Sequence, residues 1–483
     1  MNIRMVSKIT GCILQVEAGL MLLPAAVSLF YREYGVMLSF LSVAVASFLI
    51  GTVIAVCSKP KNHTIYAKEG FAVVAVAWLA VSAVGAVPFV VSGEIPSYID
   101  AFFETVSGFT TTGASVIYNV EALSRGILFW RSFTHWVGGM GFLVFVMAVI
   151  PNIPGRSMHI LKAEMPGPEV GKLVPRTKDT AKILYLIYIV MTAAETVMLI
   201  FGGMPVFDSV VHSFGTAGTG GFGIKSDSIA SYSNYCQWVI AVFMMLFAVN
   251  FNVYYLVLIR RFKAIFKSSE MWYYFAIIGV STSAICINLM PHYSKFSNCI
   301  RDSFFQVSSV ITTTGYATAD FDAWPQLSKT IILLLMLVGA CAGSTGGGLK
   351  VSRAVLLFKV IAREVRKLTH PRSVSAIKFE GKTVDEKTLS GVTVYFAVYM
   401  LCLLTAFLLI SFEPFGIETN FSAAAACFNN IGPGLAKVGP ASNYAAYTGF
   451  SKLVLSASML LGRLEIFPML IAFSPSVWAK SKQ

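Results

Sequence analysis

Apolar runs of about twenty residues recur along the whole chain, and each is long enough to cross the ~30 Å hydrocarbon core of a bilayer. The pattern predicts ten membrane-spanning segments separated by polar connections. The predicted spans are residues 10–30, 36–57, 70–92, 127–150, 182–202, 236–259, 272–291, 328–349, 390–412 and 449–473. The first run lacks a small-residue cleavage site and is followed at once by a second run. We therefore interpret it as a retained helix rather than a signal peptide.

Four of the connections hold a segment that is too short to cross a membrane and too apolar for a solvated loop. Each begins with Asp or Asn and reaches a glycine 12 or 13 residues later. The four are Asp100 to Gly113, Asp208 to Gly220, Asp302 to Gly315 and Asn420 to Gly432. Gly221 would also fit the second spacing, but the Thr-Gly pair shared with the first and third segments favours Gly220. Recurrence at one architectural position predicts a single structural unit repeated four times.

Each segment is typical of a half-membrane helix followed by an irregular loop. We expect the Asp or Asn to cap the helix, and the loop to expose peptide groups, which membranes tolerate only along water or an ion path. Four such loops around one axis would replace the water shell of a cation, with the carbonyls of Thr112, Thr219, Thr314 and Ile431 facing it. Hairpins that merely pack helix ends are the alternative, which the shared register disfavours. The predicted ion-binding residues are Thr111, Thr112, Gly113, Gly218, Thr219, Gly220, Thr313, Thr314, Gly315, Asn430, Ile431 and Gly432.

A glycine-rich run, residues 339–350, interrupts the eighth predicted span. A phosphate-binding Walker A loop would place Gly-Lys-Ser/Thr after a strand, whereas Lys350 follows Leu349 and a membrane helix, so we discount nucleotide binding. Because glycine costs ~1 kcal/mol at each helical position, a broken helix is favoured over a packing cluster. The shorter run Gly138–Gly141 is interpreted as packing within an ordinary inner helix.

Arg463 lies inside the last apolar span, where a charged side chain usually faces a cavity or a partner. We expect it at the level of the glycine-rich run, donating to loop carbonyls and forming one barrier with the loop. Glu465 is two residues away and points elsewhere, and Glu195 is interpreted as a structural hydrogen-bonding group. The predicted gate comprises Gly339, Gly343, Ser344, Thr345, Gly346, Gly347, Gly348 and Arg463.

Composition and charge set the orientation. The chain has 483 residues, 56% of them hydrophobic and 13% charged, and a net charge of +13. Most basic residues fall in the termini and the even-numbered connections, which places both termini in the cytoplasm by the positive-inside rule. The charge is therefore a topology signal that also suits contact with anionic lipid headgroups, and no nucleic acid need be invoked. Eight scattered cysteines without a CxxC motif indicate neither a disulfide framework nor a transition-metal site.

These residues resemble the Trk/Ktr/HKT superfamily of potassium transporters over about residues 70–475. The resemblance extends to the glycine-rich run, which is similar to the loop that interrupts the family's third inner helix, and to Gly462–Phe467, which is similar to its last inner helix. The two extra N-terminal spans resemble the Trk H-type subunits more than the shorter Ktr B-type. The matching pore segments are Ser107–Gly113, Thr219–Phe222 and Thr312–Tyr316, whereas Asn430-Ile-Gly-Pro departs from the Thr-Thr-Gly pattern.

The resemblance implies an all-α polytopic membrane protein with four pseudo-symmetric helix–pore loop–helix repeats around a central pore. Two N-terminal transmembrane helices, residues 1–60, precede the repeats. The repeats are expected at 70–151, 182–262, 272–358 with the gate loop, and 390–475.

The resemblance also implies potassium uptake across the plasma membrane, the bacterial inner membrane, with potassium as substrate and no cofactor on this chain. A homodimer is implied, together with a cytosolic Trk A-type regulatory subunit that binds a nucleotide, ATP/ADP or NAD. A symporter coupled to H⁺ or Na⁺ stays open as an alternative, with Glu195 and His135 as weak coupling candidates, although parallel repeats disfavour it. The sequence has neither a pair of intramembrane Asp residues nor a GxSxG turn, the features that would support an enzyme.

Overall fold

Helices form nearly all of the regular structure. The structure, a computed structural model, describes residues 2–58, 67–141, 177–372 and 375–474. Within these ranges one short antiparallel strand pair occurs, β1 (Lys378–Phe379) with β2 (Lys382–Thr383). The predicted all-α fold is confirmed.

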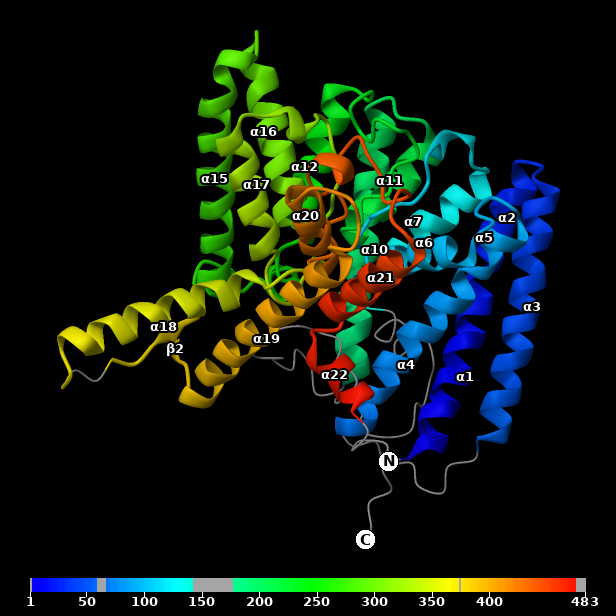
Figure 1. Ribbon diagram of the computed structural model, residues 1–483, viewed down its shortest axis with the longest axis horizontal. Coiled ribbons are helices and arrows are strands. Elements are labelled where there is room, and N and C mark those ends of the chain that lie inside the picture. The colour runs from blue at the N-terminus through cyan, green and yellow to red at the C-terminus, as the bar shows by residue number, and fades with distance from the viewer. Residues whose placement is uncertain (1, 59–66, 142–176, 373–374, 475–483) are drawn as a thin grey trace.

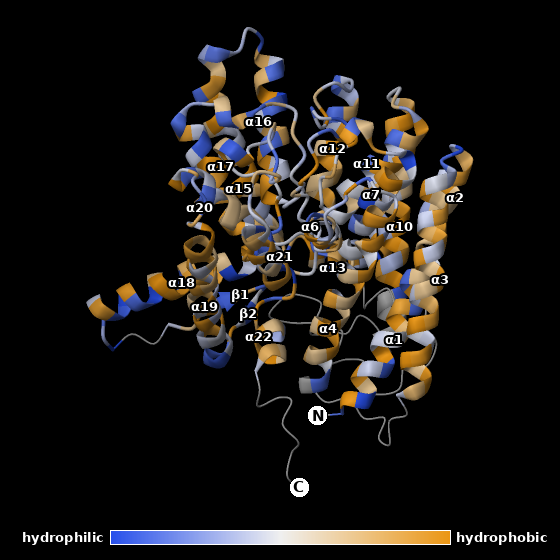
Figure 2. Ribbon diagram, turned by 45° about the vertical axis from the view of Figure 1, so that its right-hand side comes forward, coloured by the Kyte–Doolittle hydropathy of each residue, from blue (hydrophilic) through white to orange (hydrophobic). Residues whose placement is uncertain are grey.

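Six helical stretches in the described ranges are long and apolar enough to cross a membrane, and a bent helix pair makes a seventh. Their outer faces are apolar and exposed, as Figure 2 shows along α3, so these faces suit lipid rather than water. The chain is therefore a multi-pass membrane protein. The helices are α1 (Ile3–Leu20) with α2 (Leu22–Phe30), α3 (Tyr34–Cys57), α4 (Ala67–Gly85) with α5 (Val87–Val91), α10 (Thr177–Phe201), α15 (Ser269–Leu289) with η2 (Met290–His292), and α19 (Glu386–Ile410).

The inner helices of all four repeats end or bend, although the sequence predicts a break only in the third. In the first, α7 (Arg125–Gly139) ends inside the Gly138–Gly141 run. In the second, α12 (Asn234–Phe247) and α13 (Phe251–Leu258) meet at 90°. The other breaks lie between α17 (Gln326–Val338) and α18 (Val351–Thr369), and between α21 (Gly449–Arg463) and α22 (Phe467–Phe473).

The predictions of continuous helices at 127–150, 236–259 and 449–473 are therefore wrong, and so is the expectation that Gly138–Gly141 lies within an ordinary inner helix. The packing role of this run is confirmed, because a Cβ on Gly138 or Gly139 would overlap the backbone of Phe109 or Gly218. An apolar run reports a membrane environment and says little about where the backbone leaves the helix. Residues 142–150 of the fourth predicted span lie outside the described residues.

Four short helices of 12 to 16 residues carry the repeated segments. The expected capping role of their Asp or Asn is wrong, because Ser97 caps the first helix and Asp302 lies well inside the third. These side chains instead bind neighbouring segments: Asp100, for example, accepts from Lys452 Nζ of α21 at 2.6 Å. The pore helices are α6 (Tyr98–Phe109), α11 (Val206–Gly218), α16 (Phe296–Ile311) and α20 (Ile417–Phe428); the remaining short helices are η1 (Val120–Ala122), α14 (Phe262–Ile265), η3 (Phe321–Ala323) and η4 (Ala436–Val438).

The pore helices pack against longer helices, as α16 does against α15, α12 and α17. In Figure 1, α1 and α3 form one edge of the molecule, α15 to α17 form the other, and α18 projects away from the body. The start of α1 and the helix α22 lie at the same end of the molecule, as expected for two termini on one side of a membrane.

The contact between α1 and α3 generates a test of the fold. A Cβ built on Gly51 would lie 2.6 Å from the carbonyl oxygen of Gly11, so the two backbones leave no room for a methyl group. We expect Gly51→Ala to lower stability in detergent by about 1–3 kcal/mol, measured as a lower unfolding temperature. Gly19→Ala on α1 is the control, because nothing lies within 4 Å of its Cβ position. Equal unfolding temperatures for both variants would contradict this packing.

Candidate ion pathway

The four loops that follow the pore helices share one backbone conformation. In each loop, a non-glycine residue with positive φ and a glycine with positive φ flank one residue that lacks a positive φ. Non-glycine side chains avoid positive φ, so this pattern is rare outside functional sites. The four left-handed pairs are Thr111 with Gly113, Thr219 with Gly221, Thr313 with Gly315, and Asn430 with Gly432.

This shared conformation corrects the register of the second repeat. Gly221, with φ +74°, occupies the position of Gly113, Gly315 and Gly432, whereas the Thr-Gly pattern assigns Gly220 there. The carbonyl equivalent to that of Thr112 therefore belongs to Gly220 rather than to Thr219. Gly218, at the end of α11, packs against the backbone of His135, one residue before the left-handed pair.

The loops form a closed ring. A Cβ built on the left-handed glycine of each repeat would overlap a carbonyl oxygen of another repeat, and the four contacts run in chain order around one circle. Because this sequence of contacts returns to its start, the loops surround a common axis. The contacts are Gly113 with the Gly220 oxygen, Gly221 with the Thr314 oxygen, Gly315 with the Ile431 oxygen, and Gly432 with the Thr112 oxygen.

Hydroxyl and amide side chains hold the ring without adding charge to it. The hydroxyl oxygens of Thr110 and Thr112 lie 2.8 Å apart, and those of Thr312 and Thr314 repeat that distance. Asn430 Nδ2 donates to Thr112 Oγ1 at 3.0 Å, so the divergent fourth loop is fastened directly to the first. All these side chains are buried.

A cavity lies on each side of the ring. The outer cavity has a volume of about 140 Å³ and is lined by the residues that follow the ring in all four repeats, including Ser115, Gly223, Ala317 and Pro433. The inner cavity is narrower, about 40 Å³, and is lined by Gly139, Gly343, Gly346 to Gly348, Lys350 and Arg463, among others. The ring is therefore the partition between two spaces.

Residues 339–350 leave the helix, as predicted, and form an intramembrane loop directly beneath the ring. Gly339, Gly343 and Gly348 have positive φ, and Gly339 and Gly348 approach so closely that the loop has a narrow neck. The Gly347 amide donates to Thr313 Oγ1 at 2.7 Å, which ties the loop to the third ring segment. Ser344 Oγ closes the loop internally on the Cys341 carbonyl at 2.7 Å.

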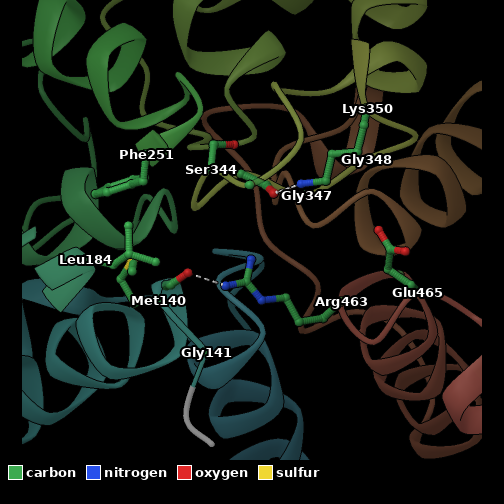
Figure 3. A pocket seen from close by; sticks show the side chains of 14 residues that line it. Met140, Gly141, Leu184, Phe251, Ser344, Gly347, Gly348, Lys350, Arg463 and Glu465 are labelled. Atoms are coloured by element: carbon green, nitrogen blue, oxygen red, sulfur yellow. Dashed lines mark hydrogen bonds between the residues drawn. The ribbon is translucent and has the colours of Figure 1, made fainter. Parts of the chain in front are cut away.

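Arg463 joins this loop to the broken end of α7. Its Nη1 donates to the Thr345 carbonyl at 2.8 Å, and its Nη2 lies 2.6 Å from the carbonyl oxygens of both Gly138 and Gly139. Figure 3 shows the guanidinium reaching across the inner cavity toward Met140, with Glu465 pointing away from it. Arg463 therefore donates to a loop carbonyl, as the sequence predicts.

The comparisons with known proteins agree with this architecture. Residues 39–279 and 272–480 match the family described as TrkH, cation transport protein. The chain belongs to the TrkH family. It is 35% identical over 485 residues to the Trk system potassium uptake protein TrkH of Salmonella typhimurium and to that of Escherichia coli K12, covering 99% of the chain and 100% of each relative. The Trk system potassium uptake protein TrkG of E. coli K12 is 33% identical over 483 residues, 99% of either chain.

A solved structure shows the same fold. The crystal structure of the potassium transporter TrkH from Vibrio parahaemolyticus superposes with a TM-score of 0.90 at 33% identity, and it covers 99% of this chain and 100% of that one. The predicted family is therefore confirmed, and membership of a transport family excludes the enzyme alternative.

Three further charged side chains lie at the loop or next to it, in roles that the sequence patterns do not indicate. Glu270 Oε1, at the start of α15, accepts the Ala342 amide at 2.8 Å and the Ser352 amide at 3.1 Å, so one carboxylate holds both ends of the loop. Lys350 Nζ donates to the Gly346 carbonyl. Arg353 binds both carboxylate oxygens of Glu465, at 3.0 and 2.6 Å.

The position of Arg463 predicts how the loop responds when its anchor is lost. Cys341 in the loop is 1% exposed. In a variant that keeps Cys57 and Cys341 as its only cysteines, Arg463→Ala should raise maleimide labelling of Cys341 roughly tenfold, because the loop opens more often. Labelling of the exposed Cys57 serves as the internal reference, and Arg366→Ala on α18 as the control variant. Unchanged Cys341 labelling would show that Arg463 does not hold the loop.

Proposed function

We propose that this TrkH-family chain takes up potassium across the bacterial plasma membrane through the four-loop ring. The observation that carries the proposal is the closed circle of left-handed glycines and neighbouring carbonyls. Support also comes from relatives that are named potassium uptake proteins and align over the whole chain. Both termini are cytoplasmic in this proposal, in keeping with the distribution of basic residues.

The ring provides the chemistry that cation selection requires. Carbonyl oxygens of Thr112, Gly220, Thr314 and Ile431 belong to four separate segments at equivalent positions, so they can substitute for the water around a dehydrated ion. The carbonyl ends of α6, α11, α16 and α20 lead into the ring, and helix dipoles favour a cation there. The proposed ion-binding set is therefore the one predicted from the sequence, with Gly221 added to the second segment.

The loop and Arg463 form the gate in this proposal. The loop narrows the path beneath the ring, and the fixed charge of Arg463 repels a cation that enters the inner cavity. Opening requires displacement of a glycine-rich segment held by a few hydrogen bonds, which costs less than repacking large side chains.

A channel-like pathway predicts specific ion behaviour in proteoliposomes. Wild-type protein should pass potassium in preference to sodium, with a reversal potential that follows the potassium gradient and ignores proton and sodium gradients. Dependence on either of those gradients would favour the symporter. Absence of potassium-selective flux would overturn the proposed function.

The selectivity should depend on the ring glycines. Gly315 has φ +83°, and a side chain there would meet the Ile431 carbonyl oxygen. We expect Gly315→Ser to lower the potassium-to-sodium flux ratio by roughly tenfold, because the carbonyl must move. Gly203→Ser is a matched control: Gly203 has the same φ of +83°, but open space surrounds it. Equal flux ratios in the two variants would remove Gly315 from the filter.

We also propose that the chain works as a homodimer with a cytosolic subunit that binds ATP, ADP or NAD. The projecting helix α18 supports both partners. One face of α18 exposes Phe358, Ile361, Val365 and Leu368, which share a helical stripe suited to a second copy. The other face is basic, and α18 begins at Val351, directly after the intramembrane loop.

The charge on α18 gives a test of the cytosolic contact. Arg363 already binds Glu386 within the chain, so it is a poor docking residue, whereas the Arg366 side chain is exposed. In lipid-free detergent, Arg366→Glu should weaken capture of a tandem nucleotide-binding subunit roughly fivefold. Lys329→Glu, at the start of α17, is the control. If Arg366→Glu captures the subunit as well as the wild type does, this face is assigned to lipid. Light scattering of the same samples measures whether the chain is a dimer.

A further inference from the structure

A buried ion pair lies directly behind the ring. Arg131 of α7 binds Glu104 of the first pore helix, with both Nε and Nη2 lying 2.8 Å from Glu104 Oε1. Both side chains are almost fully buried, at 2% and 0% exposure. Removing two charges from water costs free energy that only good geometry and further hydrogen bonds can offset, so the remaining contacts of this pair are informative.

Those remaining contacts all go to the chain that leaves the ring. Glu104 Oε2 accepts the Val116 amide at 3.0 Å, and Oε1 accepts the Ser115 hydroxyl at 3.0 Å. These residues follow Gly113 of the first loop. Arg131 Nη1 donates to the Gly223 carbonyl at 3.3 Å, and its guanidinium lies 4.2 Å from the ring centre of Phe222, next to Gly221 of the second loop. One ion pair therefore fastens the first and second loops to each other.

The residue at the equivalent position, four residues after the Asp or Asn that opens each repeated segment, makes different contacts in the other repeats. In the third repeat this residue is Gln306, whose Nε2 donates to the Ala319 carbonyl at 2.9 Å, again beyond the ring glycine. In the second it is His212, whose backbone carbonyl accepts from Tyr316 of the third loop. In the fourth it is Ala424, whose side chain can form no hydrogen bond. Only the first and third repeats therefore hold the chain beyond the ring glycine through this side chain, and only the first does so with an ion pair.

We propose that the Glu104–Arg131 pair is a positioning element of the filter, which sets the separation of the first and second loops and thereby the preference for potassium. Neither residue needs to touch the ion, since the pair acts through Val116 and Gly223. The inference rests on the proposed function and adds residues outside the ring to its selectivity. The pair also cancels the charge of Arg131, which lines the outer cavity that a cation must enter.

A set of variants separates positioning from simple electrostatics. Glu104→Gln leaves the Arg131 charge uncompensated, Arg131→Gln leaves the Glu104 charge uncompensated, and the double variant restores neutrality without the pair. Glutamine is the residue that the third repeat uses, so Glu104→Gln keeps a plausible hydrogen-bonding group. Arg131→Lys retains the charge but loses the forked geometry of the guanidinium.

Positioning predicts a fall in the potassium-to-sodium flux ratio of roughly threefold or more in all four variants, in the same direction. The measurement is rubidium uptake into proteoliposomes with sodium as competitor, together with the unfolding temperature of each purified variant. Arg363→Gln is the control, because its ion pairs with Glu364 and Glu386 lie on α18 and at the start of α19, away from the ring.

Two results would overturn the inference. In the first, the flux ratio changes in opposite directions in Glu104→Gln and Arg131→Gln and equals the wild-type ratio in the double variant. This result would show that the pair acts only through its electric field. A lower unfolding temperature with an unchanged flux ratio would show that it supports the fold alone. If the neutral variants fail to fold, Arg131→Lys decides by the same criteria. Wild-type protein without selective flux would instead count against the proposed function.

Discussion

Peptide groups that leave a helix inside a membrane must find new partners, and this constraint organises the centre of the molecule. Four inner helices break beside one another, which frees carbonyls and amides far from water. Positively charged side chains bind the freed carbonyls, and a carboxylate binds the freed amides. Arg463 and Lys350 donate to freed carbonyls, and Glu270 accepts freed amides at both ends of the loop. These ionisable residues at membrane depth therefore stabilise the broken backbone.

The polar groups at the ring, by contrast, are mostly neutral. Threonine hydroxyls bind each other, Asn430 binds Thr112, and Tyr444 donates to the Gly432 carbonyl at 2.7 Å. Because few full charges lie next to the ring, its carbonyls remain the strongest negative groups available to an ion. The exception, Arg131, is neutralised by Glu104 within 2.8 Å.

Much of this arrangement could be predicted from the sequence. The glycine-rich run is long enough to exclude a helix, and Arg463 stands out because an isolated charge in an apolar span requires a partner. The repeated segments from Asp or Asn to Gly indicate the ring, because a segment that recurs at the same position in four connections is rarely a coincidence. The family resemblance depends on these same residues, and the comparisons confirm it.

What could not be predicted depends on contacts between distant segments. Spacing allows Gly220 or Gly221, and only the sign of φ, which is +74° at Gly221, distinguishes them. The break between α12 and α13 is hidden in the sequence because only two polar residues, Asn250, which caps α13, and Asn252, stand among apolar neighbours. Glu104 and Arg131 lie 27 positions apart and match no motif, so their meeting is a consequence of the fold.

Carrying all four loops on a single polypeptide has an evolutionary consequence. In a ring built from four identical subunits, every substitution is applied four times and the symmetry is preserved. Here a codon change alters one quarter of the ring, as the Asn430-Ile-Gly sequence of the fourth loop illustrates. Substitutions can therefore change the ring one loop at a time, and a second substitution in a neighbouring loop can reverse the effect of the first. A single chain can thereby form intermediate rings that an assembly of identical subunits cannot form.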